Sequence, residues 1–79
     1  MKVFVIDDER EMVDLIQLGL KKRGFSVVPF NSGADALAAL TEHDVDVVVT
    51  DLNMKGMNGL DVCQRIETDR PDIPVIVLT

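Results

Sequence analysis

The chain has 79 residues, 47% of them hydrophobic and 28% charged, which leaves room for one small globular domain and argues against a disordered or low-complexity segment. Its 14 acidic residues outnumber its 8 basic ones and give a net charge of -6, which disfavours direct contact with a nucleic-acid backbone. A single cysteine excludes an internal disulfide and a cysteine-rich zinc site, and no apolar run reaches the length of about 18 residues that spans a membrane, so we expect a soluble cytoplasmic protein.

The first half of the chain predicts two strands separated by a helix. Residues 3–6 form a continuous apolar run, typical of a strand buried on both faces, that ends at the acidic cluster 7–9. Apolar residues at three- and four-residue spacing then predict an amphipathic helix, which Gly24 ends. Residues 25–30 follow as a second strand. Pro29 assigns this strand to an edge of the sheet, because proline cannot donate a ladder hydrogen bond.

The second half repeats the alternation. Ser32 is a predicted N-cap that begins a second helix, and the β-branched residues 45–50 form a third strand that ends at Asp51. A glycine-containing loop leads to a third helix with Asn58 as its N-cap, and residues 73–78 form a last apolar strand. This order predicts an α/β domain with a parallel sheet and right-handed crossovers.

The last strand has the sequence of an interior strand, yet no later element covers its far edge or one of its faces. We therefore expect residues 1–79 to be the N-terminal portion of a longer protein. We also expect the outer face and edge of this strand to be exposed, which favours self-association.

Acidic side chains follow two strands of the predicted sheet. Asp7 and Asp8 come after the first strand and Asp51 after the third, and a sheet of order 2-1-3-4 makes these two strands neighbours, about 4.8 Å apart. Open parallel sheets bind ligands at this edge, where the strand order reverses. The sequence therefore predicts that three carboxylates share one pocket.

Three clustered carboxylates repel one another by roughly 4 kcal/mol per pair at a separation of about 4 Å. Oxygen ligands without histidine or thiol suit a hard cation, and Mg²⁺ fits best. Such an ion would also neutralise an incoming phosphoryl group, so that an adjacent aspartate can act as the nucleophile. The expected reaction class is phosphoryl transfer.

Each residue also has a purely structural interpretation. Asp7 and Asp8 would stabilise the positive end of the first helix, Asp51 would be an ordinary loop acid, Lys55 a solvated loop charge and Thr79 the end of a strand. The coincidence of acids after two neighbouring strands and a hydroxyl after the fourth favours a functional site.

In this order and spacing, three segments resemble a bacterial two-component response-regulator receiver domain: VIDDE at 5–9, VVVTDLNMKGMNG at 47–59 and PVIVLT at 74–79. The resemblance implies a flavodoxin-like, doubly wound parallel sheet. It also implies a phosphoacceptor function, in which Asp51 takes a phosphoryl group from a sensor histidine kinase. Such a domain is not an enzyme acting on an external substrate, although it sheds its own phosphate.

The resemblance further implies the roles of the site residues. Asp8 and Asp51 would hold Mg²⁺ directly, the backbone carbonyl of Asn53 would add a third ligand, and Asp7 would act largely through water. Thr79 would hydrogen-bond the aspartyl phosphate and move on activation, as a switch.

The chain departs from the family pattern in two respects. Lys55 stands where the family usually has proline. A full receiver also continues through a fourth helix, a fifth strand and a fifth helix, which bring the lysine that pairs with the phosphate. Residues 70–79 resemble receivers of NtrC-class transcription activators, and this resemblance implies a role in transcription regulation.

Two other functions are compatible with the sequence. One is a receiver-like protein-binding module that is not phosphorylated and whose acids are vestigial. The other is a small Mg²⁺-dependent phosphohydrolase, which is disfavoured because the chain has no histidine placed as a base and no Asp-x-Asp pair after the first strand.

Overall fold

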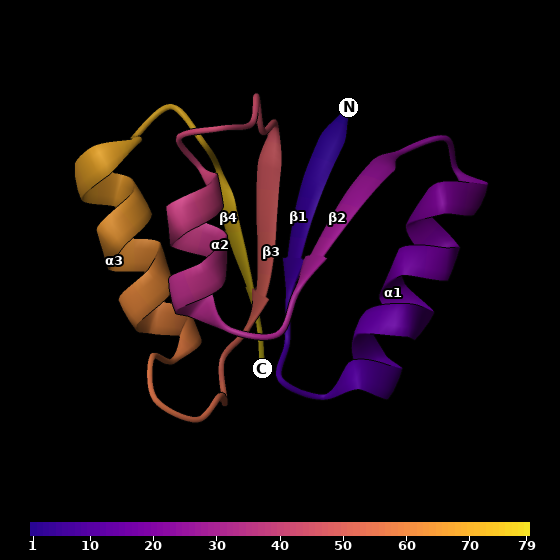
Figure 1. Cartoon of the computed structure of the whole chain (residues 1–79), viewed down its shortest axis with the longest axis horizontal. Coiled ribbons are helices and arrows are strands. Elements are labelled where there is room, and N and C mark those ends of the chain that lie inside the picture. Colours follow the sequence, from indigo (N-terminus) through magenta and orange to yellow (C-terminus); the bar gives the residue numbers. More distant parts are fainter.

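The computed structural model describes residues 1–79 and has four strands alternating with three helices, as the sequence predicts. The strands are β1 (Lys2–Ile6), β2 (Ser26–Phe30), β3 (Val47–Asp51) and β4 (Val75–Leu78), and the helices are α1 (Arg10–Lys22), α2 (Gly33–Ala39) and α3 (Gly59–Asp69). Figure 1 shows three layers, with α2 and α3 on one side of the sheet and α1 on the other.

All four strands are parallel and are arranged in the order β2-β1-β3-β4, which confirms the predicted order. Pro29 lies in β2 at one edge of the sheet, opposite Val5, so its missing N–H costs no ladder hydrogen bond to a further strand. Because β2 and β3 lie on opposite sides of β1, right-handed crossovers carry α1 to one face and α2 to the other.

The main core lies between the sheet and the α2–α3 layer. Met54 and Met57 of the β3–α3 loop are partly buried and pack against it. The core contains nine buried side chains: Phe4, Ile6, Ala36, Leu40, Val45, Val48, Val62, Ile66 and Ile73. Val3 and Val5, which alternate with Phe4 and Ile6 along β1, are equally buried on the face toward α1. Coverage of both faces explains why the sequence of β1 is continuously apolar up to Asp7.

The helix ends follow the predicted capping residues. Gly24 has φ +89° just after α1, and the Ser32 hydroxyl accepts a hydrogen bond from the N–H of Asp35 at the start of α2. At α3, the Asn58 side chain accepts from the N–H of Asp61 while the Asp61 carboxylate accepts from the N–H of Asn58.

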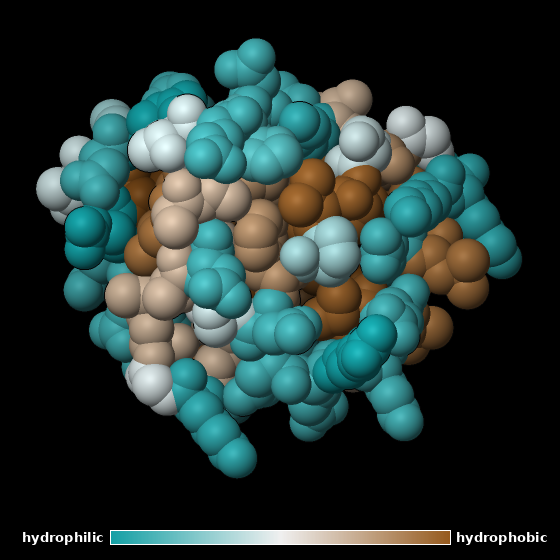
Figure 2. Space-filling model, in the orientation of Figure 1, coloured by the Kyte–Doolittle hydropathy of each residue, from teal (hydrophilic) through white to brown (hydrophobic).

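The outer side of β4 is exposed, as expected. Ile76 and Leu78 are 51% and 40% exposed, and β4 has no neighbour on its far edge. Ile76 is aligned with Val49, and Val49 with Val5, so both β4 side chains lie on the face of the sheet toward α1. Figure 2 shows apolar side chains that reach the surface between the sheet and α1 and on α1 itself, where Leu15 and Leu18 are among the exposed apolar residues.

Candidate functional site

Asp7 and Asp8 leave the carboxyl end of β1 in different environments. The N–H of Asp7 donates to the carbonyl of Phe30, which continues the β1–β2 pairing past Ile6 and keeps Asp7 buried at 5% exposure. One Asp7 oxygen, Oδ1, accepts a hydrogen bond from the N–H of Glu9 at 2.9 Å. Asp8 lies beyond this pairing and is exposed, and its Oδ2 accepts from the N–H of Lys55 at 3.1 Å.

Asp51 is the last residue of β3 and is aligned with Leu78 of β4. The next residue, Leu52, donates its N–H to the carbonyl of Leu78, and the N–H of Gly59 donates to the carbonyl of Leu52. These bonds hold the chain on both sides of the loop from Asn53 to Asn58. Asp51 itself is half-buried, so its carboxylate lies at the boundary between the sheet and solvent.

Gly59 brings the start of α3 against the end of β3. A Cβ atom at this position would collide with the backbone carbonyl oxygen of Asp51 and would lie 2.9 Å from the Cα of Leu52. Both obstacles are backbone atoms, which cannot rotate away. The close approach therefore requires glycine, and it fixes the loop that follows Asp51.

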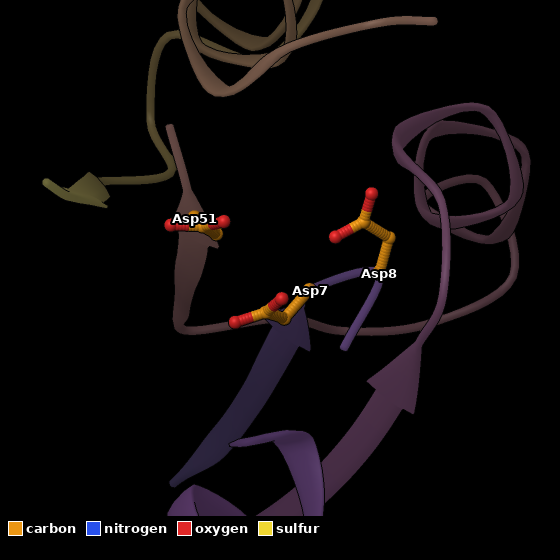
Figure 3. Close-up of side chains that lie close together, drawn as sticks. All are labelled: Asp7, Asp8 and Asp51. Carbon is orange, nitrogen blue, oxygen red and sulfur yellow. The ribbon is translucent and has the colours of Figure 1, made fainter. Parts of the chain in front are cut away.

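The three carboxylates come together at this edge of the sheet (Figure 3). One oxygen from each of Asp7, Asp8 and Asp51 lies within 4.8 Å of the others. The two salt bridges of the chain, Arg65–Asp69 and Arg70–Asp72, involve none of these acids, so the three carboxylates repel one another without a salt-bridge partner. Oxygen donors of this kind, with no nitrogen or sulfur, fit a hard divalent cation such as Mg²⁺.

A cavity of about 620 Å³ opens beside Asp8. Its lining comes mainly from the loop after β3 and comprises Asp8, Leu52, Asn53, Met54, Lys55 and Asn58. Asp8 is the one clustered acid that lines this space, which is open to solvent rather than a closed pocket.

Asn53 and Thr79, the other two predicted site residues, are both exposed. Asn53 lines the same cavity as Asp8, and Thr79 follows β4 one residue after the partner of Asp51 in the ladder. No side-chain hydrogen bond connects either residue to the three acids. The structure therefore brings Asp7, Asp8 and Asp51 into one cluster, with Asn53 on the cavity wall beside Asp8 and Thr79 directly after the end of β4.

Two contacts at this site are missing from the sequence-based interpretation. The N–H of Lys55 donates to Asp8, whereas the sequence predicts only a solvated charge at this residue, and Gly59 packs against the backbone of Asp51. The first is a backbone contact without a residue-type signal. The second depends on the distance between α3 and β3, which no local pattern gives.

The single thiol of the chain lies outside this site. Partial burial raises the pKa of Cys63, and the neighbouring Glu67 carboxylate, 3.7 Å from the sulfur, raises the pKa further. Cys63 therefore stays protonated near neutral pH and is a poor nucleophile.

None of the three helices has both the length and the apolar composition that a membrane-spanning helix requires.

A family model described as the response regulator receiver domain matches residues 3–79. Among curated proteins, the transcriptional regulatory protein QseB of Haemophilus influenzae is 38% identical over the whole chain, and the regulatory protein VanR of Enterococcus faecium is 33% identical over 99% of it. The matched regions are 36% and 33% of those proteins, so the chain spans about a third of their length.

Among solved structures, the response regulator protein TrrA of Thermotoga maritima in complex with Mg²⁺ and BeF matches with a TM-score of 0.94 and 29% identity, over 99% of this chain and 68% of that one. TrrA in complex with the histidine kinase ThkA matches with a TM-score of 0.92 and 29% identity, over 99% of this chain and 67% of that one. Both matches cover nearly the whole chain and therefore all four strands and all three helices described above.

Proposed function

Since the chain belongs to the response regulator receiver domain family, we propose that it is a phosphoacceptor of a two-component system, in which Asp51 takes a phosphoryl group from a sensor histidine kinase in the presence of Mg²⁺. The observation that carries this proposal is the cluster of Asp7, Asp8 and Asp51 oxygens within 4.8 Å of one another. The complexes of TrrA with Mg²⁺ and BeF and with a histidine kinase support it.

In this proposal Asp8 and Asp51 hold the ion directly, the backbone carbonyl of Asn53 is the third protein ligand, and Asp7 acts through water. The bound ion supplies positive charge that offsets the charge of the carboxylates and of the incoming phosphoryl oxygens. This division of roles agrees with burial, because Asp8 is exposed at the mouth of the cavity whereas Asp7 is buried and already accepts the N–H of Glu9.

Asp51 is the nucleophile in the transfer step. One carboxylate oxygen attacks the phosphorus of the kinase phosphohistidine, an O–P bond forms as the N–P bond breaks, and the imidazole leaves with the electron pair and takes up a proton. The position of Thr79 at the same edge, after β4, supports a hydrogen bond from its hydroxyl to the phosphoryl oxygens. Later attack of water on the acyl phosphate restores Asp51, so the chain loses its phosphate without acting on other substrates.

Labelling with acetyl phosphate and Mg²⁺ tests the proposal without the kinase. We expect the intact mass of the unaltered chain to increase by one phosphoryl group. Asp51→Asn should remove the label, because the amide is not a nucleophile, whereas Asp44→Asn should keep it, because Asp44 is an exposed acid between α2 and β3 at the other end of the sheet. Labelling that persists in Asp51→Asn would contradict the assignment of the acceptor.

One observation favours the alternative, a receiver-like protein-binding module that is not phosphorylated. No lysine or arginine forms a salt bridge with Asp7, Asp8 or Asp51, so no such ion pair offsets their negative charge toward an incoming phosphoryl group. In this alternative the unaltered chain takes up neither Mg²⁺ nor a phosphoryl label, and the same labelling experiment distinguishes the two functions.

We also propose a cytoplasmic location and a role in transcription regulation, as the names of QseB and VanR suggest. These residues would not contact nucleic acid themselves, since their net charge is -6. The exposed outer side of β4 further supports weak self-association of this chain.

A further inference from the structure

The loop after β1 and the loop after β3 are joined by one hydrogen bond outside the sheet, from the N–H of Lys55 to Oδ2 of Asp8 at 3.1 Å. The bond connects residues that are 47 positions apart. The other hydrogen bond to a clustered carboxylate, from the N–H of Glu9 to Asp7, is local to the first loop. The Lys55 N–H is therefore the hydrogen bond that links the β3–α3 loop to the acids that follow β1.

This bond fixes both of its partners. Asp8 is exposed and makes no salt bridge, so the hydrogen bond from the N–H of Lys55 is the contact that orients its carboxylate. The bond uses Oδ2 and leaves Oδ1 free for another ligand. It also draws Lys55 to the cavity wall that Asp8 and Asn53 share, two residues after Asn53.

A hydrogen bond from an N–H to an ionised carboxylate is stronger than one between neutral groups. Groups that hydrogen-bond a metal-ligating carboxylate fix its orientation, and their loss typically lowers metal affinity by about 10- to 100-fold. The bond depends on the backbone at position 55 and not on the lysine side chain, which is exposed. A proline at this position has no N–H and cannot make it.

We propose that the backbone N–H of Lys55 is a positioning group of the divalent-cation site: it holds Asp8 in a ligating orientation and keeps the loop that contains Asn53 closed over the acids. This inference rests on the proposed function, because it assumes that Asp8 and Asp51 bind Mg²⁺. It adds to the proposed function a backbone donor, the N–H of Lys55, whose loss lowers the affinity of the site for Mg²⁺.

The test compares two substitutions that both remove the ammonium and differ in the N–H. Mg²⁺ affinity is measured by isothermal titration calorimetry on Lys55→Pro and Lys55→Ala, with thermal unfolding as a check that both chains are folded. We expect Mg²⁺ to bind Lys55→Pro about tenfold more weakly than Lys55→Ala. Equal affinities of the two variants would overturn the inference.

Because proline also restricts the residue before it, a second chain isolates the N–H itself. Ligation at Cys63 allows an ester to replace the amide at position 55, with the lysine side chain retained. We expect this chain to bind Mg²⁺ about tenfold more weakly than the unaltered one. Unchanged affinity would overturn the inference even if Lys55→Pro binds weakly, because the defect would then come from the proline ring.

A metal-free readout completes the test. Amide hydrogen exchange measured by NMR should show the Lys55 N–H protected in the unaltered chain and unprotected in Asp8→Ala, while the Asp61 N–H of the α3 cap stays protected in both. A Lys55 N–H that exchanges at the same rate in both chains would overturn the inference. Failure of the unaltered chain to bind Mg²⁺ would contradict the proposed function, and the inference with it.

Discussion

At the scale of single residues, Gly59 is the position where the backbone has the least room. A side chain there would meet the carbonyl of Asp51 and the Cα of Leu52, whereas a Cβ at Gly19 in α1 would have nothing within 4 Å. The same substitution should therefore have opposite effects on stability at the two glycines.

We predict that Gly59→Ala lowers the free energy of unfolding by about 1 to 3 kcal/mol, because the backbone must shift to admit the methyl group. Gly19→Ala should raise it by about 0.5 to 1 kcal/mol, because alanine stabilises the interior of an exposed helix. Urea unfolding monitored by circular dichroism measures both values. A Gly59→Ala chain as stable as the unaltered one would show that α3 does not press against the end of β3.

The residues of the acid cluster could be predicted because each follows a strand whose apolar pattern is unambiguous. Asp7 and Asp8 end the run before α1, Asp51 ends the β-branched run of β3, and the strand order makes these ends neighbours. The Lys55 N–H could not be predicted in this way. Every non-proline residue carries an N–H, and only the folded loop selects the one that reaches Asp8.

At the scale of elements, α3 depends on its N-terminal cap. Asn58 and Asp61 each accept a backbone N–H from the other, at 2.9 and 3.0 Å, and the cap immediately precedes Gly59 and its contact with β3. At the start of α2, the Ser32 hydroxyl accepts the N–H of Asp35 at 3.2 Å, and Asp35 does not accept the N–H of Ser32 in return.

We predict that Asn58→Ala destabilises the chain by about 1 kcal/mol or more, because it leaves the N–H of Asp61 without its acceptor. Ser32→Ala is the matched control at α2 and should cost less, because its cap bond is longer and single. Chemical denaturation of both variants gives the comparison. A larger loss for Ser32→Ala would contradict the ranking.

The starts of two strands were the least accurate part of the prediction. β3 begins at Val47 rather than at residue 45, and β4 begins at Val75 rather than at residue 73. Val45 and Ile73 are buried in the core without being in the ladder, so the apolar pattern extends past the hydrogen-bonded strand. Burial and strand pairing are different properties, and the sequence pattern reports only the first.

At the scale of the whole molecule, the alternation of strands and helices predicted a parallel sheet, and the strand order 2-1-3-4 agrees with the family that the sequence resembles. Proline at 29 indicates an edge for β2, and right-handed crossovers then distribute the helices over the two faces. The remaining edge, β4, has no charged residue and exposes Ile76 and Leu78, a combination that natural edge strands usually avoid.

We predict weak, concentration-dependent dimerisation through β4, because a four-residue edge buries less surface than the roughly 1,200 to 2,000 Å² of a stable interface. Ile76→Lys should shift the chain to monomer by placing a charge on that surface. Leu18→Lys is the control, since Leu18 is 55% exposed on α1, which packs over β1 and β2, toward the edge of the sheet opposite β4. Size-exclusion chromatography with light scattering measures the masses, and an unaltered chain that stays monomeric at high concentration would exclude the dimer.

The central claim is that Asp7, Asp8 and Asp51 form one binding site for a divalent cation. A Mg²⁺ titration followed by ¹H–¹⁵N NMR tests it most directly, because it locates the ion as well as detecting it. We predict saturable shifts concentrated at residues 7–9 and 51–55 in the unaltered chain, and their loss in Asp8→Asn. Shifts that do not saturate, or that remain in Asp8→Asn, would contradict the claim.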